Sequence, residues 1–214
     1  MLIRPRSAIT VLPALVAVTG YAVMWLGYRD GWHWLDSVDA SSLHALYDVG
    51  IKHPSWVRFW EVVSSACGPT AFRLVGAVAV AVELVKRRVR AALFLVVSIE
   101  FSGFVTEVAK DLAGRPRPVT ALANTSSSSF PSGHALAVMV GVLALLTVLL
   151  PMMSQAMGVV AVVGGALIVV AVGFGRVALN LHHPSDVVAG WALGYLYFVV
   201  CAWLFRPPPV ITRG

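Results

Sequence analysis

The chain has few charged residues and few cysteines, and both shortages limit the classes of protein to which it can belong. Asp, Glu, Lys and Arg make up 12% of its 214 residues, whereas a soluble globular domain carries about 25%. Hydrophobic residues make up 58%, and the mean hydropathy is +0.83. We therefore expect most of the surface to face lipid rather than water. The length predicts a single domain over residues 1–214.

The two cysteines, Cys67 and Cys201, lie far apart, in or beside apolar runs. Two are too few for a disulfide framework, and their spacing is not that of a metal site. We expect both to be small buried hydrophobic side chains.

Positive charge exceeds negative charge, with a formal net charge of +6 and a pI of about 9.8. Because the basic residues gather at the ends of the apolar runs, this excess indicates membrane lipids and an anionic substrate as partners, and not nucleic acid. The sequence does not predict an oligomeric state.

Six apolar runs approach or reach the roughly 20 residues that a helix needs to cross a bilayer. They predict an all-α, integral membrane six-helix bundle. The first run could be a cleaved signal peptide, but its length and the lack of a clear small-residue cleavage site favour a retained helix. Residues 56–66 could extend the short second run past a break at Gly68-Pro69. The runs are 8–26, 71–85, 91–112, 134–150, 157–179 and 185–205.

Two polar stretches interrupt these runs. Residues 27–69 mix tryptophan with aspartate, which is typical of an interfacial segment with short helices on the membrane surface. Residues 119–130 are rich in serine, and they fit either a solvated linker or a mobile lid over a site.

The basic residues also predict orientation. A tight cluster, Lys86, Arg87, Arg88 and Arg90, joins the second and third runs and is expected in the cytoplasm. Alternating helices then place both termini in the cytoplasm and the three polar motifs within residues 110–186 on the extracytoplasmic side of the cell membrane. Half of the sixteen Lys and Arg residues fall inside, including Arg4, Arg6, Arg206 and Arg213.

The first motif ends the third run. Pro116 and Pro118 stop the helix. Arg117 offers a planar fork of donors that suits phosphate oxygens, and Lys110 offers a point charge. Lys and Arg at helix ends also commonly snorkel to the membrane surface, so this motif alone does not decide a function.

The second motif, Pro131-Ser132-Gly133-His134, opens the fourth run. Ser132 is a predicted N-cap, and Gly133 lets a ligand approach the backbone. A helix N-terminus binds anions, so His134 would lie beside the anion. The structural alternative for His134 is a polar cap at the interface.

The third motif joins Gly175-Arg176 to His182 and Asp186 around the start of the sixth run. Asp186 is close enough in sequence to accept a hydrogen bond from one nitrogen of His182, leaving the other nitrogen free to attack. Asp186 could also serve as a helix-dipole partner, and the two roles are compatible. His183 fits a structural role better than catalysis.

Together the motifs resemble those of the type 2 phosphatidic acid phosphatase family, whose bacterial members include phosphatidylglycerophosphate and polyprenyl diphosphate phosphatases. The family's spacing is matched: Lys, six residues, Arg-Pro; then Pro-Ser-Gly-His; then Arg, five residues, His, three residues, Asp. The same pattern occurs in soluble haloperoxidases of the superfamily, and the six apolar runs argue against that branch.

The resemblance implies a lipid phosphate phosphatase that uses no metal and no cofactor. It makes His182 the nucleophile of a phosphohistidine intermediate, His134 the acid and Asp186 the residue that orients His182. One departure is Gly175, where the family usually has serine, so a weakened or altered phosphate contact is expected there. The implied phosphate-binding residues are Lys110, Arg117, Ser132, Gly133 and Arg176.

Two other functions remain open. A lipid phosphotransferase could use the same intermediate with a lipid hydroxyl as acceptor. A lipid-binding or transport protein would explain the helices and cations, but not the matched positions of the histidines. For Glu107 the sequence leaves open a pair with Lys110 or a structural bond to a neighbouring helix; Glu100 is predicted on the same helical face.

Overall fold

A computed structural model describes residues 6–123 and 127–205, with side chains described from residue 11 onward. All regular secondary structure in these ranges is helical, which confirms the predicted all-α class. Arg4, Arg206, Arg213 and the side chain of Arg6, which entered the orientation argument, lie outside the description. The elements are α1 (Arg6–Arg29), α2 (His33–Lys52), α3 (Pro54–Ala66), α4 (Pro69–Val85), α5 (Val89–Glu100), α6 (Ser102–Ala113), α7 (Gly133–Leu149), the short 3₁₀ turn η1 (Leu150–Met152), α8 (Gln155–Ala178) and α9 (Pro184–Phe205).

Six stretches of the described chain are long and apolar enough to cross a membrane, as predicted, and the chain is a multi-pass membrane protein. Two of them are broken. α3 and α4 meet at Gly68, with Pro69 in the first turn of α4, where its missing N–H costs nothing. α5 and α6 meet at Phe101, a break that the sequence did not predict. There the Ser102 hydroxyl donates to the Ile99 carbonyl over 2.6 Å, a local bond of the kind that competes with the helical ladder.

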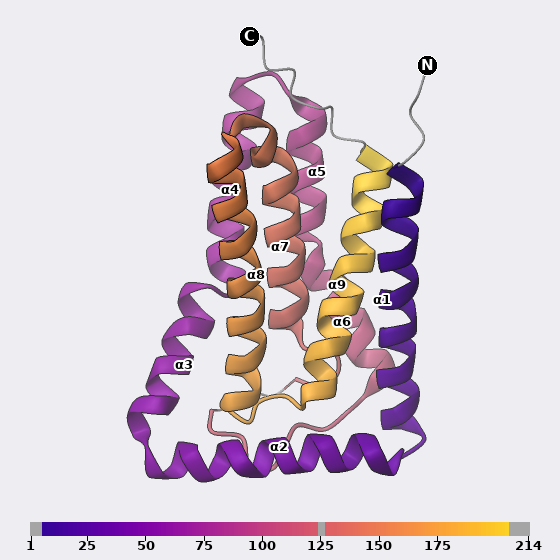
Figure 1. Cartoon of the computed structure of the whole chain (residues 1–214), viewed down its shortest axis with the longest axis vertical. Helices are drawn as coiled ribbons and strands as arrows, with labels where there is room; N and C mark the ends of the chain where they lie inside the picture. Colours follow the sequence, from indigo (N-terminus) through magenta and orange to yellow (C-terminus); the bar gives the residue numbers. More distant parts are fainter. Residues whose placement is uncertain (1–5, 124–126, 206–214) are drawn as a thin grey trace.

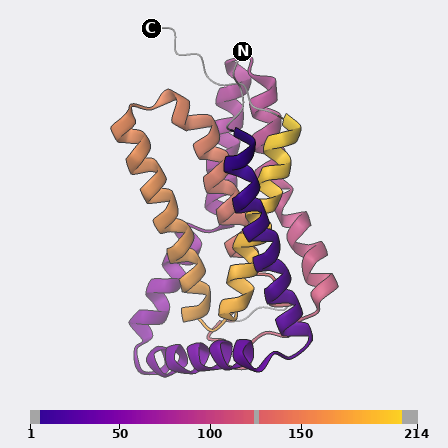
Figure 2. The same ribbon diagram turned by 45° about the vertical axis from the view of Figure 1, so that its right-hand side comes forward.

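The spans run roughly along the long axis, and α2 lies across one end of them (Figures 1 and 2). α7 occupies the middle of the bundle, and its Ala135, Leu136, Val138 and Val140 are fully buried. Large apolar side chains remain exposed on the outer helices α1, α4 and α8. In a membrane protein such a surface is the one that faces lipid.

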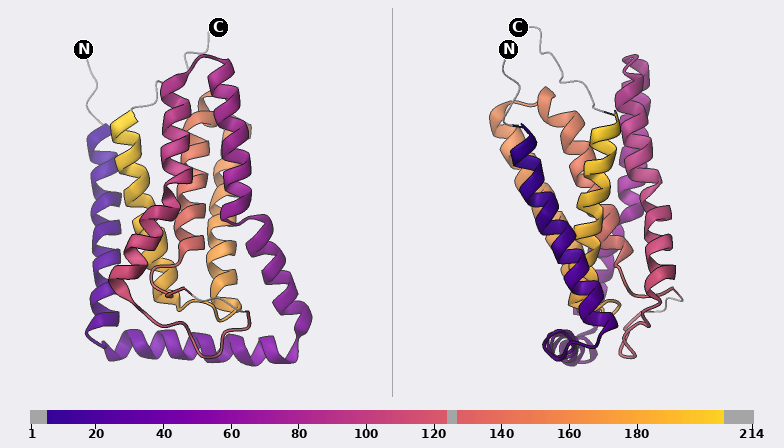
Figure 3. Two further views of the ribbon diagram at one scale, coloured as in Figure 1. Left: turned by 180° about the vertical axis from the view of Figure 1, so that it is seen from behind. Right: turned by 90° about the vertical axis from the view of Figure 1, so that its right-hand side faces the viewer.

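The polar stretch at 27–69 divides into two parts. α2 is a single helix that turns Leu35, Asp39 and Leu43 inward. α3 instead climbs away from α2 toward α4 (Figure 3), and it belongs to the apolar stretch Pro54–Val85. The surface segment is therefore shorter than expected, and the position of α2 at the membrane surface stays a prediction.

The three motifs meet at the end of the bundle that α2 covers. α7 and α9 begin there and α8 ends there, whereas α1 begins and α9 ends at the opposite end (Figures 1 and 3). The basic turn between α4 and α5 also lies at that opposite end. Alternating helix directions therefore bring residues 110–118, 131–134 and 175–186 to one end, as the sequence predicted.

Candidate active site

His182 lies in a tight turn between α8 and α9 and is 1% exposed. The turn is closed by the backbone N–H groups of Leu181 and His182, which donate to the Arg176 carbonyl over 3.0 and 3.3 Å. Asn180 takes a positive φ of 52°, a conformation that Asn tolerates better than most residues. Its side-chain carbonyl accepts from the Thr120 hydroxyl over 2.8 Å, which joins this turn to the loop of the first motif.

The hydrogen bonds of His182 define its tautomer. Nδ1 lies 2.7 Å from the Ser129 carbonyl oxygen, and Nε2 lies 3.2 Å from a guanidinium nitrogen of Arg117. A carbonyl can only accept and a guanidinium can only donate, so Nδ1 carries the hydrogen and Nε2 presents its lone pair to Arg117. Burial lowers the pKa of His182 to about 4, against the opposing pull of Asp186. The ring is therefore neutral at physiological pH, with Nε2 unprotonated.

Asp186 does not orient His182 by the expected direct hydrogen bond. Its Oδ2 lies 3.6 Å from His182 Nδ1, which is too long for one, and the Ser129 carbonyl takes that place. Asp186 accepts instead from Arg115 over 2.6 Å and from the backbone N–H of His183 over 2.8 Å. Asp186 can therefore act on His182 through its charge and through the turn that it fixes. Motif spacing did not reveal the orienting group because it is a main-chain carbonyl.

A buried ion-pair network behind Asp186 was also missed by the sequence reasoning. Arg115 donates to Asp186 and, over 2.9 Å, to Asp39 of α2, and its guanidinium carbon lies 4.6 Å from the centre of the Tyr28 ring. Asp39 also accepts from the backbone N–H and the hydroxyl of Ser185. Burial alone would lower the pKa of Arg115, but the two carboxylates raise it above its usual value. The network fastens α2 to the start of α9.

Lys110 and Arg117 meet at the hydroxyl of Ser127, which lies 3.0 Å from Lys110 Nζ and 3.1 Å from an Arg117 nitrogen. Arg117 also donates to the carbonyls of Ser127 and Leu181, both over 2.7 Å, and burial lowers its pKa.

Of the Ser-rich stretch 119–130, residues 124–126 lie outside the description. Its end is not a solvated linker, since Ser129 is fully buried and bound to the first-motif loop.

The two acidic residues left open by the sequence have different partners. Glu107 pairs with Lys110 over 3.4 Å, whereas Glu100 lies 3.8 Å from Arg73 of the neighbouring helix α4. The break at Phe101 places Glu100 on α5 and Glu107 on α6. The prediction that they share one helical face is therefore wrong.

The second motif lies where α7 begins. Ser132 holds the N-cap position with an extended backbone, but its side chain makes no capping bond. Its N–H donates to the Asp186 carbonyl over 2.9 Å, and its buried Oγ has no partner among the described residues. A Cβ on Gly133 would come within 2.8 Å of the Thr106 side chain, so glycine lets α6 pack here. His134, half-buried, lies within electrostatic range of His182 and of the cations Lys110, Arg117 and Arg176.

Arg176 completes the cluster from α8. It is 8% exposed, and its Nε finds no acceptor among the described residues. A second such orphan, Ser132 Oγ, lies on the neighbouring motif. Buried polar atoms without partners are rare in proteins and call for an explanation. These two atoms come from different motifs, and one of them belongs to a cation that lies in the same cluster as Lys110 and Arg117. Such a cluster is suited to an anion.

Comparison with known proteins identifies the family to which this chain belongs. Residues 91–208 match the PAP2 superfamily. The chain belongs to that family. Bacillus subtilis phosphatidylglycerophosphatase B is 40% identical over 98 residues, covering 44% of this chain and 48% of the relative. An undecaprenyl-diphosphatase of Sulfolobus acidocaldarius is 32% identical over 116 residues, covering 51% and 52%.

The matched regions thus span about half the length of these curated relatives. A crystal structure of a transmembrane PAP2 type phosphatidylglycerolphosphate phosphatase from B. subtilis superposes with a TM-score of 0.78 at 22% identity. That match covers 94% of this chain and 98% of the other. The two proteins share the fold.

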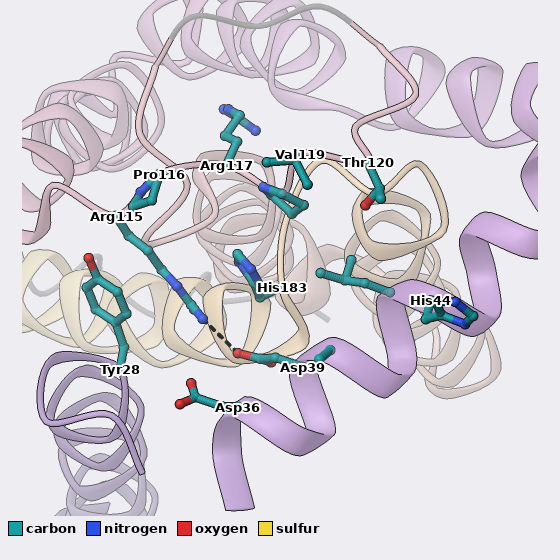
Figure 4. Close-up of a pocket in the computed structure, with 13 residues that line it drawn as sticks. Tyr28, Asp36, Asp39, His44, Arg115, Pro116, Arg117, Val119, Thr120 and His183 are labelled. Atoms are coloured by element: carbon teal, nitrogen blue, oxygen red, sulfur yellow. Dashed lines mark hydrogen bonds and ion pairs between the residues drawn. The ribbon is translucent and has the colours of Figure 1, made fainter. Parts of the chain in front are cut away.

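The PAP2 motifs border a hollow and one of two neighbouring apolar grooves. The hollow, of about 570 Å³, lies between α2 and the loop that carries Arg115 and Arg117 (Figure 4). His183 also lines it, whereas His134, Arg176 and His182 do not. One groove, of about 440 Å³, runs between α2, α8 and α9. The other, of about 350 Å³, runs between α7, α8 and α9 and shares Val170 and Trp191 with the first.

Proposed function

We propose that the chain is a phosphatase that hydrolyses the phosphomonoester or diphosphate head group of a lipid through a phosphohistidine on His182. The observation that carries this proposal is the arrangement of His182: a buried, neutral imidazole whose Nε2 lone pair points at Arg117, with Nδ1 held by the Ser129 carbonyl. A nucleophile prepared in its reactive tautomer, with a cation beside the attacking atom, is what attack on a phosphoryl group requires.

In the first step the lone pair of His182 Nε2 forms a bond to phosphorus while the bond from phosphorus to the leaving oxygen breaks. His134 transfers its proton to that oxygen, so the lipid leaves as an alcohol from a monoester or as a lipid monophosphate from a diphosphate. Lys110, Arg117 and Arg176 stabilise the charge on the phosphoryl oxygens. These three cations provide the charge for which other phosphatases use a metal ion.

In the second step water attacks the phosphorus of the phosphohistidine and gives its proton to His134. The nitrogen–phosphorus bond breaks, its electron pair returns to Nε2, and phosphate is released. Asp186 stabilises the positive charge that develops on His182 during the cycle. Arg115 and Asp39 hold that carboxylate in place.

The apolar grooves support a lipid as the substrate. The groove between α2, α8 and α9 is lined by Val177, which follows Arg176, and by Pro184, two residues beyond His182. An acyl or prenyl chain lying there would leave its head group at the cations. The names of the two curated relatives point to phosphatidylglycerophosphate and a polyprenyl diphosphate as substrates to test first.

The distribution of charge supports an active site on the extracytoplasmic side of the cell membrane. The basic turn at Lys86–Arg88 lies at the end of the bundle opposite to the motifs. Basic loops favour the cytoplasmic side, so His182 and α2 would face outward.

The test is phosphate release by the purified full-length chain in detergent, with phosphatidylglycerophosphate, phosphatidate and undecaprenyl diphosphate compared side by side. His182→Ala should abolish release, while excess chelator should leave the wild-type rate unchanged. His44→Ala is the matched control, because His44 lines the adjacent hollow with a mostly exposed side chain and should retain wild-type activity. Release that persists in His182→Ala would remove the covalent mechanism.

A further inference from the structure

Gly175 leaves space beside the phosphate-binding Arg176, and a residue from another helix reaches into it. We infer that Ser64 of α3 donates its hydroxyl to the phosphoryl group held by Arg176, supplying from α3 the side-chain contact that residue 175 lacks. This inference rests on the proposed function, since it assigns a further phosphate-binding residue to the same site.

The position of Ser64 is the first support. Ser64 Oγ lies 3.2 Å from the point that a Cβ on Gly175 would occupy. The absence of a side chain at Gly175 therefore allows the approach, and a serine at 175 would crowd Ser64 and the Trp60 ring, 3.0 Å from the same point. The two positions compete for one space beside Arg176.

The second support is that the Ser64 hydroxyl is buried without a partner. Ser64 is 4% exposed and is the buried residue of α3, yet its Oγ has no hydrogen bond within the described structure. Hydroxyls inside helices commonly donate to the carbonyl one turn back. Thr106 and Thr147 of this chain do so, over 2.9 and 2.7 Å. Ser64 does not, so its donor remains available for a ligand.

The third support is that the chain around Ser64 touches both other parts of the site. Four residues on, a Cβ at Gly68 would lie 3.5 Å from Cδ2 of His134. The junction of α3 and α4 therefore lies between the second and third motifs. Two further orphan atoms, Arg176 Nε and Ser132 Oγ, belong to those motifs. A phosphoryl group with three oxygens would provide acceptors for all three.

Ser98 is another buried serine whose hydroxyl has no partner among the described residues, and it lies outside the three motifs. It lies on α5 between Leu95 and Ile99, which belong to an apolar cluster. Ser98→Ala is therefore the matched control for the loss of a buried hydroxyl with no ligand to meet.

The experiment measures orthovanadate binding by titration calorimetry on the full-length chain in detergent, together with kcat and KM for the preferred lipid phosphate. Ser64→Ala should weaken vanadate binding and lower kcat/KM, each about tenfold, as expected for a lost hydrogen bond to a charged group. Ser98→Ala should change neither. Adding Gly175→Ser to Ser64→Ala should recover part of the loss, because the new hydroxyl enters the space that Ser64 Oγ vacates, whereas Gly175→Ser alone should weaken binding by crowding.

Vanadate affinity and kcat/KM that are unchanged in Ser64→Ala would overturn the inference, as would equal losses in Ser64→Ala and Ser98→Ala. A double variant that is weaker than Ser64→Ala would also count against the exchange of positions. These results are separable from failure of the proposed function, which would appear as a wild-type chain that releases no phosphate from any of the lipids.

Discussion

Replacing Asp39 by alanine tests whether α2 holds in place the end of the bundle where the three motifs meet. The change removes the bond from Arg115 over 2.9 Å and both bonds from Ser185, one from its backbone N–H over 3.0 Å and one from its hydroxyl. Removing one partner of a buried ion pair costs about 3–5 kcal/mol. Because Arg115 keeps Asp186 as a second partner, we expect about 3 kcal/mol.

For a chain of this length that loss corresponds to a melting temperature lower by about 10 °C. We also expect kcat to fall about tenfold, because Ser185 and Asp186 share the turn that fixes His182. The assay is thermal unfolding in detergent, alongside phosphate release.

Asp36→Ala is the control for Asp39→Ala. Asp36 lies one turn earlier on α2 and lines the same hollow, but it is exposed (Figure 4). Its replacement should change stability by less than about 0.5 kcal/mol. If Asp39→Ala melts and turns over like the wild type, the coupling of α2 to the active site is refuted.

Two other predictions follow from the site. The pKa of His182, lowered to about 4, predicts that kcat/KM falls about tenfold per pH unit below pH 4, where Nε2 becomes protonated; a pH–rate profile that stays flat below pH 4 would contradict the role of His182 as nucleophile. Val170 lines both apolar grooves, so Val170→Trp should raise KM several-fold for a long-chain lipid phosphate but not for a water-soluble phosphomonoester, and equal effects on both would argue against chain binding in the grooves.

The helices could be predicted from the sequence because each span is long and apolar, and the break at Pro69 because proline marks it. The break at Phe101 could not, since it depends on a single serine hydroxyl turned to its own backbone. The lie of α2 depends on tertiary contacts. Its inward residues include Asp39, and a hydrophobic pattern does not predict that an aspartate is buried. Asp39 is buried because it pairs with Arg115, which lies 76 residues further along the chain.

At the site, the motifs predicted which side chains gather, and the structure brings all three segments to one end of the bundle. What they did not predict is the bonding among the gathered residues. The orienting partner of His182 is the carbonyl of Ser129, a group that every residue possesses and that no motif can mark. Asp186 pairs instead with Arg115, a residue to which the motif pattern assigns no role.

The distribution of charge connects the two unpredicted contacts, that of His182 with the Ser129 carbonyl and that of Asp186 with Arg115. Arg115 forms ion pairs with both Asp39 and Asp186 within one buried network. Among the described side chains neither Asp39 nor Asp186 forms an ion pair with Lys110, Arg117 or Arg176. Of these three cations only Lys110 has a carboxylate partner, Glu107, which is 63% exposed. Three cations in a poorly solvated space repel one another. Such an arrangement is stabilised by an anion that takes up the excess charge, and a phosphoryl group reaching Arg117 meets the lone pair of His182 at the same point. In the proposed mechanism, substrate binding and nucleophilic attack therefore use the same cation, Arg117.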